Sequence, residues 1–154
     1  MKSYLIFRIS KVSLRRTIDL CLVAFFFHLS GCSTSEEVNV VAVDGMVTNL
    51  DKPIEGAQVV FHPIDSALQL PHRPIGVTDS GGKFCLTTFE QNDGAPVGEY
   101  VVTIKQLEPR EVGEEVVRSG RNLLPQRYCE PGTSPLRYHV GEKNNVPANF
   151  VLSK

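Results

Sequence analysis

Apolar and polar residues alternate along the chain in short stretches separated by turn-forming residues, and this pattern predicts β-strands. A period of two places the apolar side chains on one face of each strand. Asp79-Ser80-Gly81-Gly82 is the strongest turn signal, because glycine readily adopts the positive φ that hairpin turns require. No stretch after residue 39 has a helical period. The pattern predicts strands at 41–48, 57–62, 75–78, 83–88, 99–105, 136–140 and 148–152.

One long segment, 108–135, interrupts the alternation. It contains four prolines and three glycines, with charged residues throughout. A segment of this length without secondary structure is uncommon inside a compact domain and often serves function. We therefore expect an irregular insertion that carries contacts to a partner. The candidate contacts are Arg118, Arg121, Arg127 and Tyr128.

Seven short strands without helices predict an all-β fold. A single open sheet would leave one apolar face in water, whereas two sheets packed face to face bury both. The predicted fold is a seven-stranded Greek-key β-sandwich that follows an N-terminal signal helix.

The first 31 residues have a different pattern. A basic stretch precedes ten mostly apolar residues, Leu20 to Leu29, and the run ends in Leu29-Ser30-Gly31-Cys32. A helix that spans a bilayer needs about 20 apolar residues, so the run favours a cleaved signal peptide over an uncleaved anchor or a buried helix. The basic residues are Lys2, Arg8, Lys11, Arg15 and Arg16.

Leu29-Ser30-Gly31-Cys32 resembles the lipobox of bacterial lipoproteins. The resemblance implies that signal peptidase recognises Leu29, Ser30 and Gly31, and that the Cys32 thiol carries lipid at the new N-terminus. The expected organisation is a signal peptide at 1–31, a tether at 32–39 and a domain at 40–154. The protein is then expected in the cell envelope, anchored to a membrane through its lipid. Ser33, rather than Asp, after the lipidated cysteine indicates the outer membrane.

The charge of the chain after residue 31 excludes one class of partner. This part has 11 Lys and Arg against 16 Asp and Glu, a net charge of −5 with His neutral. An acidic domain with scattered charges is a poor nucleic-acid binder. The membrane, and an envelope protein or glycan, are the expected partners.

Two cysteines, Cys85 and Cys129, remain after the proposed lipidation site. An oxidising envelope permits a disulfide between them, and two free thiols are the alternative. Strand alternation places Cys85 on the face opposite Phe84 and Leu86. No CxxC or Cys/His cluster has metal-ligand spacing, so the sequence predicts no metal and no cofactor.

Four segments, at 43–47, 52–59, 78–84 and 98–102, together resemble the carboxypeptidase regulatory-like domain, which has a transthyretin-like sandwich. The resemblance implies that Gly56, Gly82 and Gly98 serve backbone conformation. It also implies that Val59, Phe84, Tyr100 and Val102 serve packing. It indicates a fold and says little about function. The segments are Val43-Asp44-Gly45-Met46-Val47, Lys52-Pro53-Ile54-Glu55-Gly56-Ala57-Gln58-Val59, Thr78-Asp79-Ser80-Gly81-Gly82-Lys83-Phe84 and Gly98-Glu99-Tyr100-Val101-Val102.

The remaining polar residues give no catalytic pattern. Asp79 either accepts main-chain N–H bonds in its turn or ligates calcium, and the first role is the commoner one. We therefore expect a lipid-anchored binding or structural module of the envelope that is not an enzyme. The alternative is a small hydrolase or a metal-dependent enzyme that uses His62, His72 or His139.

Overall fold

Antiparallel strands form the first of the two larger sheets in the structure, a computed structural model that describes residues 38–66, 68, 70–143 and 145–153. The order in this sheet is β11-β8-β4-β5. The strands are β4 (Gln58–Pro63), β5 (Ile75–Val77), β8 (Gly98–Lys105) and β11 (Arg137–Val140). The predicted signal peptide, Cys32 and residues 32–37 of the predicted tether lie outside the described residues.

The second sheet has the order β12-β2-β3, and β6 also pairs with β2. Its strands are β2 (Asp44–Asn49), β3 (Lys52–Pro53), β6 (Lys83–Cys85) and β12 (Ala148–Leu152). β12 runs parallel to β2, whereas β3 and β6 run antiparallel to it. Parallel neighbours need a long connection, and here most of the domain lies between the two strands in sequence.

The inner side chains of both sheets pack into one apolar core. Phe61 of the first sheet contacts Phe150 of the second with ring centroids 6.3 Å apart. Its ring also lies 5.6 Å from Tyr100 and 5.5 Å from Tyr138. Alternation explains these positions, because every second residue of β4 and β12 is buried. The arrangement is consistent with a β-sandwich.

Smaller elements complete the unit that begins at Val38. β1 (Val40–Val41) pairs with β7 (Ala95–Pro96). A short 3₁₀ helix, η1 (Gln126–Tyr128), lies against the end of β8. Within the described ranges no helix is long and apolar enough to cross a membrane.

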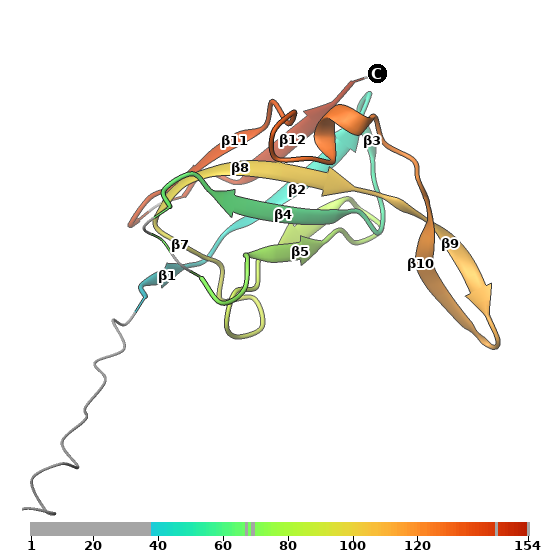
Figure 1. The fold of residues 1–154 in the computed structure, drawn as a ribbon, viewed down its shortest axis with the longest axis horizontal. Helices are drawn as coiled ribbons and strands as arrows, with labels where there is room; N and C mark the ends of the chain where they lie inside the picture. Colours follow the sequence, from blue (N-terminus) through green and yellow to red (C-terminus); the bar gives the residue numbers. More distant parts are fainter. Residues whose placement is uncertain (1–37, 67, 69, 144, 154) are drawn as a thin grey trace, which may run out of the picture. The chain divides into compact units, whose positions relative to one another are not determined.

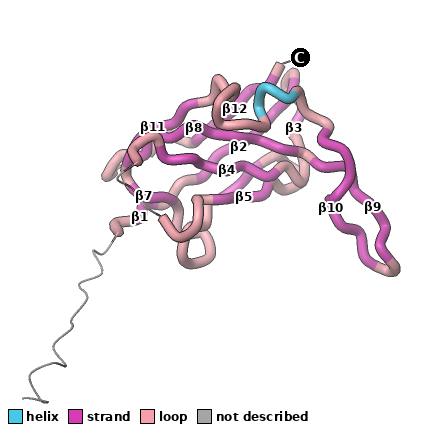
Figure 2. The backbone as a smooth tube through the Cα atoms, in the orientation of Figure 1, coloured by secondary structure: helices cyan, strands magenta, loops and turns pink. Residues whose placement is uncertain are grey.

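A two-stranded arm projects beyond the sheets (Figures 1 and 2). It consists of β9 (Leu107–Val112) and β10 (Glu115–Asn122), which pair antiparallel. Gly113 opens its two-residue turn with φ 68°, the conformation that a type II′ hairpin requires at this position. Most of the arm's residues are exposed. The expectation of an irregular segment at 108–135 is therefore wrong for its first half, because a hairpin whose two faces both meet water needs no alternation of apolar and polar residues.

The sequence prediction of an all-β fold is confirmed, and each of the seven predicted ranges overlaps a strand. The four residues expected to pack, Val59, Phe84, Tyr100 and Val102, are all buried. Gly56 and Gly82 both have positive φ. The predicted 79–82 turn forms, but the strands it joins belong to different sheets, since β5 pairs with β4 and β6 pairs with β2.

Candidate functional site

A groove of about 570 Å³ opens where β5 and β6 leave the Asp79–Gly82 turn. At the turn, the Asp79 N–H donates to the Lys83 carbonyl over 2.8 Å. At the far end, Ile75 and Thr87 exchange two main-chain bonds of 2.9 and 2.8 Å. Between these two points β5 belongs to the first sheet and β6 to the second. The groove lies along the line where these two strands meet, which we call the seam.

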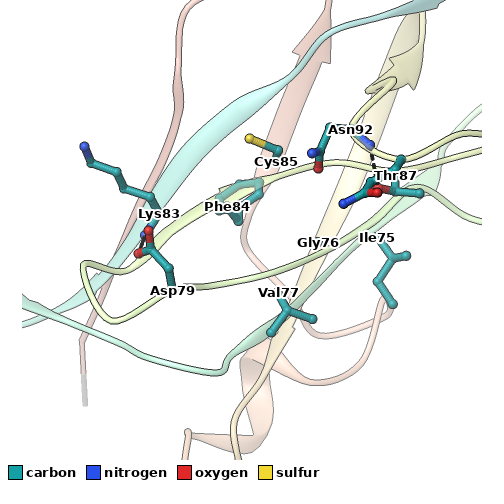
Figure 3. Close-up of a pocket in the computed structure, with 10 residues that line it drawn as sticks. Ile75, Gly76, Val77, Asp79, Lys83, Phe84, Cys85, Thr87 and Asn92 are labelled. Atoms are coloured by element: carbon teal, nitrogen blue, oxygen red, sulfur yellow. Dashed lines mark hydrogen bonds between the residues drawn. The ribbon is translucent and has the colours of Figure 1, made fainter.

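Apolar side chains and amides line the groove, with Asp79 and Lys83 at one end (Figure 3). The figure shows Cys85 and Asn92 along one border and Val77 and Ile75 along the other. Val77 is 60% exposed although it is a strand residue. The full lining is Ile75, Gly76, Val77, Asp79, Lys83, Phe84, Cys85, Thr87, Gln91 and Asn92. Exposed apolar surface beside amide groups suits an extended peptide or the face of a sugar ring.

The loop that carries Asn92 is held by the carboxylate of Asp93. Its Oδ1 accepts the Thr88 N–H over 2.7 Å, and its Oδ2 accepts the N–H groups of Phe89 and Glu90 over 2.9 Å each. Partial burial alone would raise the pKa of Asp93, but these main-chain donors favour the charged form and the net pKa is lowered. The carboxylate thereby fixes one wall of the groove.

Asp79 holds the other end of the groove in a similar way. Its Oδ1 accepts the N–H groups of Gly81 and Lys83, both over 2.8 Å. These contacts give Asp79 the turn role expected from the sequence.

A second hollow of about 680 Å³ adjoins the groove, since Ile75 and Thr87 line both. Its remaining lining comes from β4, from Thr88 and from the loop before β5: Val60, Leu70, Pro71, His72, Arg73 and Thr88. His72 and Arg73 are exposed and place basic groups at this rim. The two hollows together give the domain a concave surface with apolar walls and a cationic border.

The three histidines of the enzyme alternative have separate surroundings. The Nε2 atom of His62 lies 2.8 Å from the Thr103 hydroxyl, and burial together with the Arg73 and Lys105 charges lowers the His62 pKa. The Nδ1 atom of His139 lies 2.8 Å from a Glu99 carboxylate oxygen on the exposed surface. His72 lines the second hollow. The described residues contain no group of three or more His, Cys, Asp or Glu arranged to hold a metal ion.

The four predicted partner contacts do not form one surface. The Arg118 guanidinium of β10 lies 3.9 Å from the Glu55 carboxylate. Arg121 is exposed and bonds Glu108 over 3.1 Å. Tyr128 is buried, because its ring belongs to the core.

Arg127 and Tyr128 instead bind the end of β12. The Tyr128 hydroxyl accepts the Ser153 N–H over 3.1 Å, and the Arg127 guanidinium donates to the Ser153 carbonyl over 2.6 Å. The same guanidinium stacks on the Tyr128 ring, 4.9 Å from its centroid. These side chains satisfy main-chain groups at the edge of a strand, which is a structural role.

Of the two alternatives for Cys85 and Cys129, a disulfide or two free thiols, the structure has two free thiols. Cys85 is exposed and lines the groove, with Phe84 and Leu86 buried on the opposite face as the alternation predicted. Cys129 is buried after η1, where its sulfur accepts a bond of 2.9 Å from the Asn122 amide. Burial raises the pKa of the Cys129 thiol.

The sequence alone did not identify the groove as a candidate site. Its residues come from two sheets, and the only signals in the sequence were an apolar residue on the outer face of a short strand and amides in a turn. Only the folded structure shows that Val77, Gln91 and Asn92 line the same groove. No protein-family model, curated protein or solved structure matches this chain.

Proposed function

We propose that the protein is a lipid-anchored binding or structural module of the cell envelope, without catalytic activity. The observation that carries the proposal is Leu29-Ser30-Gly31-Cys32 after a basic stretch and a short apolar run. A lipid on Cys32 would attach the β-unit to a membrane, the outer membrane by the Ser33 criterion. Two or more acyl chains make such attachment stable, because each buried methylene contributes about 0.8 kcal/mol.

The domain is proposed to be a seven-stranded Greek-key sandwich of the transthyretin and carboxypeptidase regulatory-like type. Support comes from the seven predicted ranges, which overlap β2, β4, β5, β6, β8, β11 and β12. The common core of the two sheets also supports this assignment.

The groove beside β5 and β6 is the proposed contact surface for an envelope protein or glycan. Its exposed Val77 and the amides of Gln91 and Asn92 offer apolar contact and hydrogen bonds side by side. This surface replaces the scattered set of arginines as the candidate for partner binding.

The anchor is tested by mass spectrometry of the N-terminal peptide from cells that express the full chain. The expected peptide begins at Cys32 with a lipid mass on its sulfur, and the protein sediments with membranes. A Cys32→Ser variant should lose both, whereas the control Cys85→Ser should keep both. A mature chain that begins elsewhere with an unmodified Cys32 contradicts the anchor.

The contact surface is tested by capture of envelope proteins and glycans on the immobilised chain. Val77→Lys should lower capture of the bound partner at least tenfold, because it replaces the apolar wall of the groove with a charge. Val151→Lys is the matched control, since Val151 is also a strand residue, is 67% exposed and belongs to the other sheet. Equal capture by both variants would remove the groove from the proposal.

A further inference from the structure

The free edge of β10 carries an unpaired set of main-chain groups. Val112 and Glu115 close a two-residue hairpin and therefore exchange main-chain bonds with each other. Alternation then turns the N–H and carbonyl groups of Val117 toward β9 and those of Val116 and Arg118 toward the outside. The arm is a two-stranded sheet, so within the described residues no strand covers that side of β10.

The opposite edge of the arm is less able to pair. Pro109 lies across from Arg118 in β9, a position whose main-chain groups point outward. Proline has no N–H to donate, and it is tolerated at an edge for this reason. The edge of β9 thus lacks a donor at its middle, whereas β10 contains no proline.

Two other strand edges in the molecule are protected. The outward-facing main-chain groups of Ser153, after β12, bind Arg127 and Tyr128. The edges of β5 and β6 meet at Ile75 with Thr87 and again at Asp79 with Lys83. Natural β-proteins cover their edges to prevent unwanted pairing, so an uncovered β10 indicates an edge that is used.

We propose that β10 pairs antiparallel with β10 of a second copy of this chain, around a twofold axis at Val117. The two arms would form a four-stranded ribbon in the order β9-β10-β10-β9. This inference does not depend on the lipid anchor or on the groove.

The choice of Val117 follows from the register. In an antiparallel pair, residues that lie opposite each other have their side chains on the same face of the sheet. A twofold axis perpendicular to the sheet keeps each residue on its own face, so the axis must pass between the two copies of one residue. With Val117 on the axis, Val116 and Arg118 of each copy face each other and exchange four main-chain bonds. The valine methyl groups then lie along the aliphatic part of the arginine, and the two Val117 side chains meet.

The neighbouring registers are worse. An axis at Arg118 places two guanidinium groups opposite each other and needs regular pairing beyond residue 118, where β10 is irregular. An axis at Val116 places Glu115 against the apolar Val117 and brings the turn residue Glu114 into the ladder. In the Val117 register no like charges face each other, because Glu115 lies opposite Ser119. Val116, now 67% exposed, becomes covered.

The apolar and charge pattern of the arm is therefore compatible with a second copy in the Val117 register. The area is small, and interfaces of this size are weak in dilute solution. Covalent trapping is the suitable measurement, since it accumulates a transient complex.

The test uses the full chain in detergent with Cys21, Cys32 and Cys85 replaced by serine, and Val117→Cys introduced. Residues opposite each other in a non-hydrogen-bonded pair have Cα atoms about 4.5 Å apart, which lies within the range of a disulfide. Mild oxidation should convert Val117→Cys into a dimer. Glu115→Cys, on the same face and strand, is the matched control, because its two copies would lie about 14 Å apart.

A second pair of variants tests the hydrogen bonds. Val116→Pro removes an outward donor of β10 and should slow Val117→Cys crosslinking at least tenfold. Glu111→Pro removes an outward donor of β9 and should leave the rate unchanged. Far-ultraviolet circular dichroism verifies that each variant is folded.

Crosslinking at Val117→Cys but not at Glu115→Cys, with the Val116→Pro effect, supports the proposal. Crosslinking at both positions alike, at neither, or at Glu115→Cys alone overturns it. A Val117→Cys adduct with a different protein in whole cells, without the homodimer, also overturns it and assigns the edge to that protein.

Discussion

Replacement of Asp93 by asparagine should destabilise the domain, although the two side chains have the same shape. Asp93 uses both carboxylate oxygens, one for the Thr88 N–H and the other for Phe89 and Glu90. An asparagine has one acceptor oxygen, so its NH₂ group must face at least one main-chain donor. The variant therefore loses bonds and gains a donor–donor conflict in a half-buried turn.

The size of the effect follows from the number of bonds. A hydrogen bond to a charged group contributes about 1.5–3 kcal/mol, and removal of one partner also leaves the other unsatisfied. The asparagine oxygen can keep part of the hydrogen bonding, and water can reach the turn. The total loss is therefore smaller than the sum over the three bonds. We expect Asp93→Asn to lower the free energy of unfolding by about 3 kcal/mol at pH 7, measured by urea denaturation.

The pH dependence gives the sharper test. The Asp93 pKa is lowered in the folded protein, below the value of about 4 that aspartate has in an unfolded chain. Its contribution is therefore fully present above pH 4 and is lost as pH falls through the folded pKa. The stability difference between wild type and Asp93→Asn should shrink when the denaturation is repeated at pH 3.

Asp79→Asn is the matched control. Both of its main-chain bonds go to the single atom Oδ1, so an asparagine oxygen can keep them and the loss should stay below about 1 kcal/mol. Equal losses for Asp79→Asn and Asp93→Asn, or a difference from wild type that does not change with pH, would refute the reasoning.

Three further predictions test other contacts. Gly94→Ala should cost more than about 3 kcal/mol in urea denaturation, because φ is 104° and a Cβ would lie 1.9 Å from the Val41 carbonyl oxygen. Gly113→Ala should cost only about 1–2 kcal/mol, since no atom lies within 4 Å of its Cβ position, and equal losses would contradict the steric argument. Tyr128→Phe should cost about 1 kcal/mol and speed amide exchange at Ser153, and unchanged exchange would count against the proposed edge protection. In a chain with Cys21 and Cys32 replaced by serine, a thiol reagent should modify Cys85 in the native state and Cys129 only after unfolding; protection of both native thiols would contradict the exposure of Cys85.

Strands that have one buried face could be predicted from the sequence. The range 99–105 became part of β8, where Tyr100, Val102 and Ile104 are buried. An alternation of apolar and polar residues indicates a strand with one buried face, and the residues of this range have that alternation. The turn at 79–82 could be predicted for a different reason, since its glycines and Asp79 determine local geometry without tertiary contacts.

The arm could not be predicted in this way. Its strands expose both faces, so charged and apolar residues occur on both faces without an alternating pattern, and Pro109 weakened the strand signal further. Gly113 was the one local indication of a hairpin. The sheet assignment of β5 and β6 was equally hidden, because the choice between pairing with each other and pairing with β4 and β2 depends on distant residues.

The parallel contact between β12 and β2 has a consequence for biogenesis. Ala148 lies opposite Gly45 and Leu152 opposite Asn49, so about a hundred residues must be synthesised between the two partners. Pairing over such a separation slows folding. Until residues 148–152 are released, one side of β2 has no neighbour and is exposed to chance association with other nascent chains. A chain interrupted before β12 would retain that defect permanently, which would make it a substrate for proteolytic quality control.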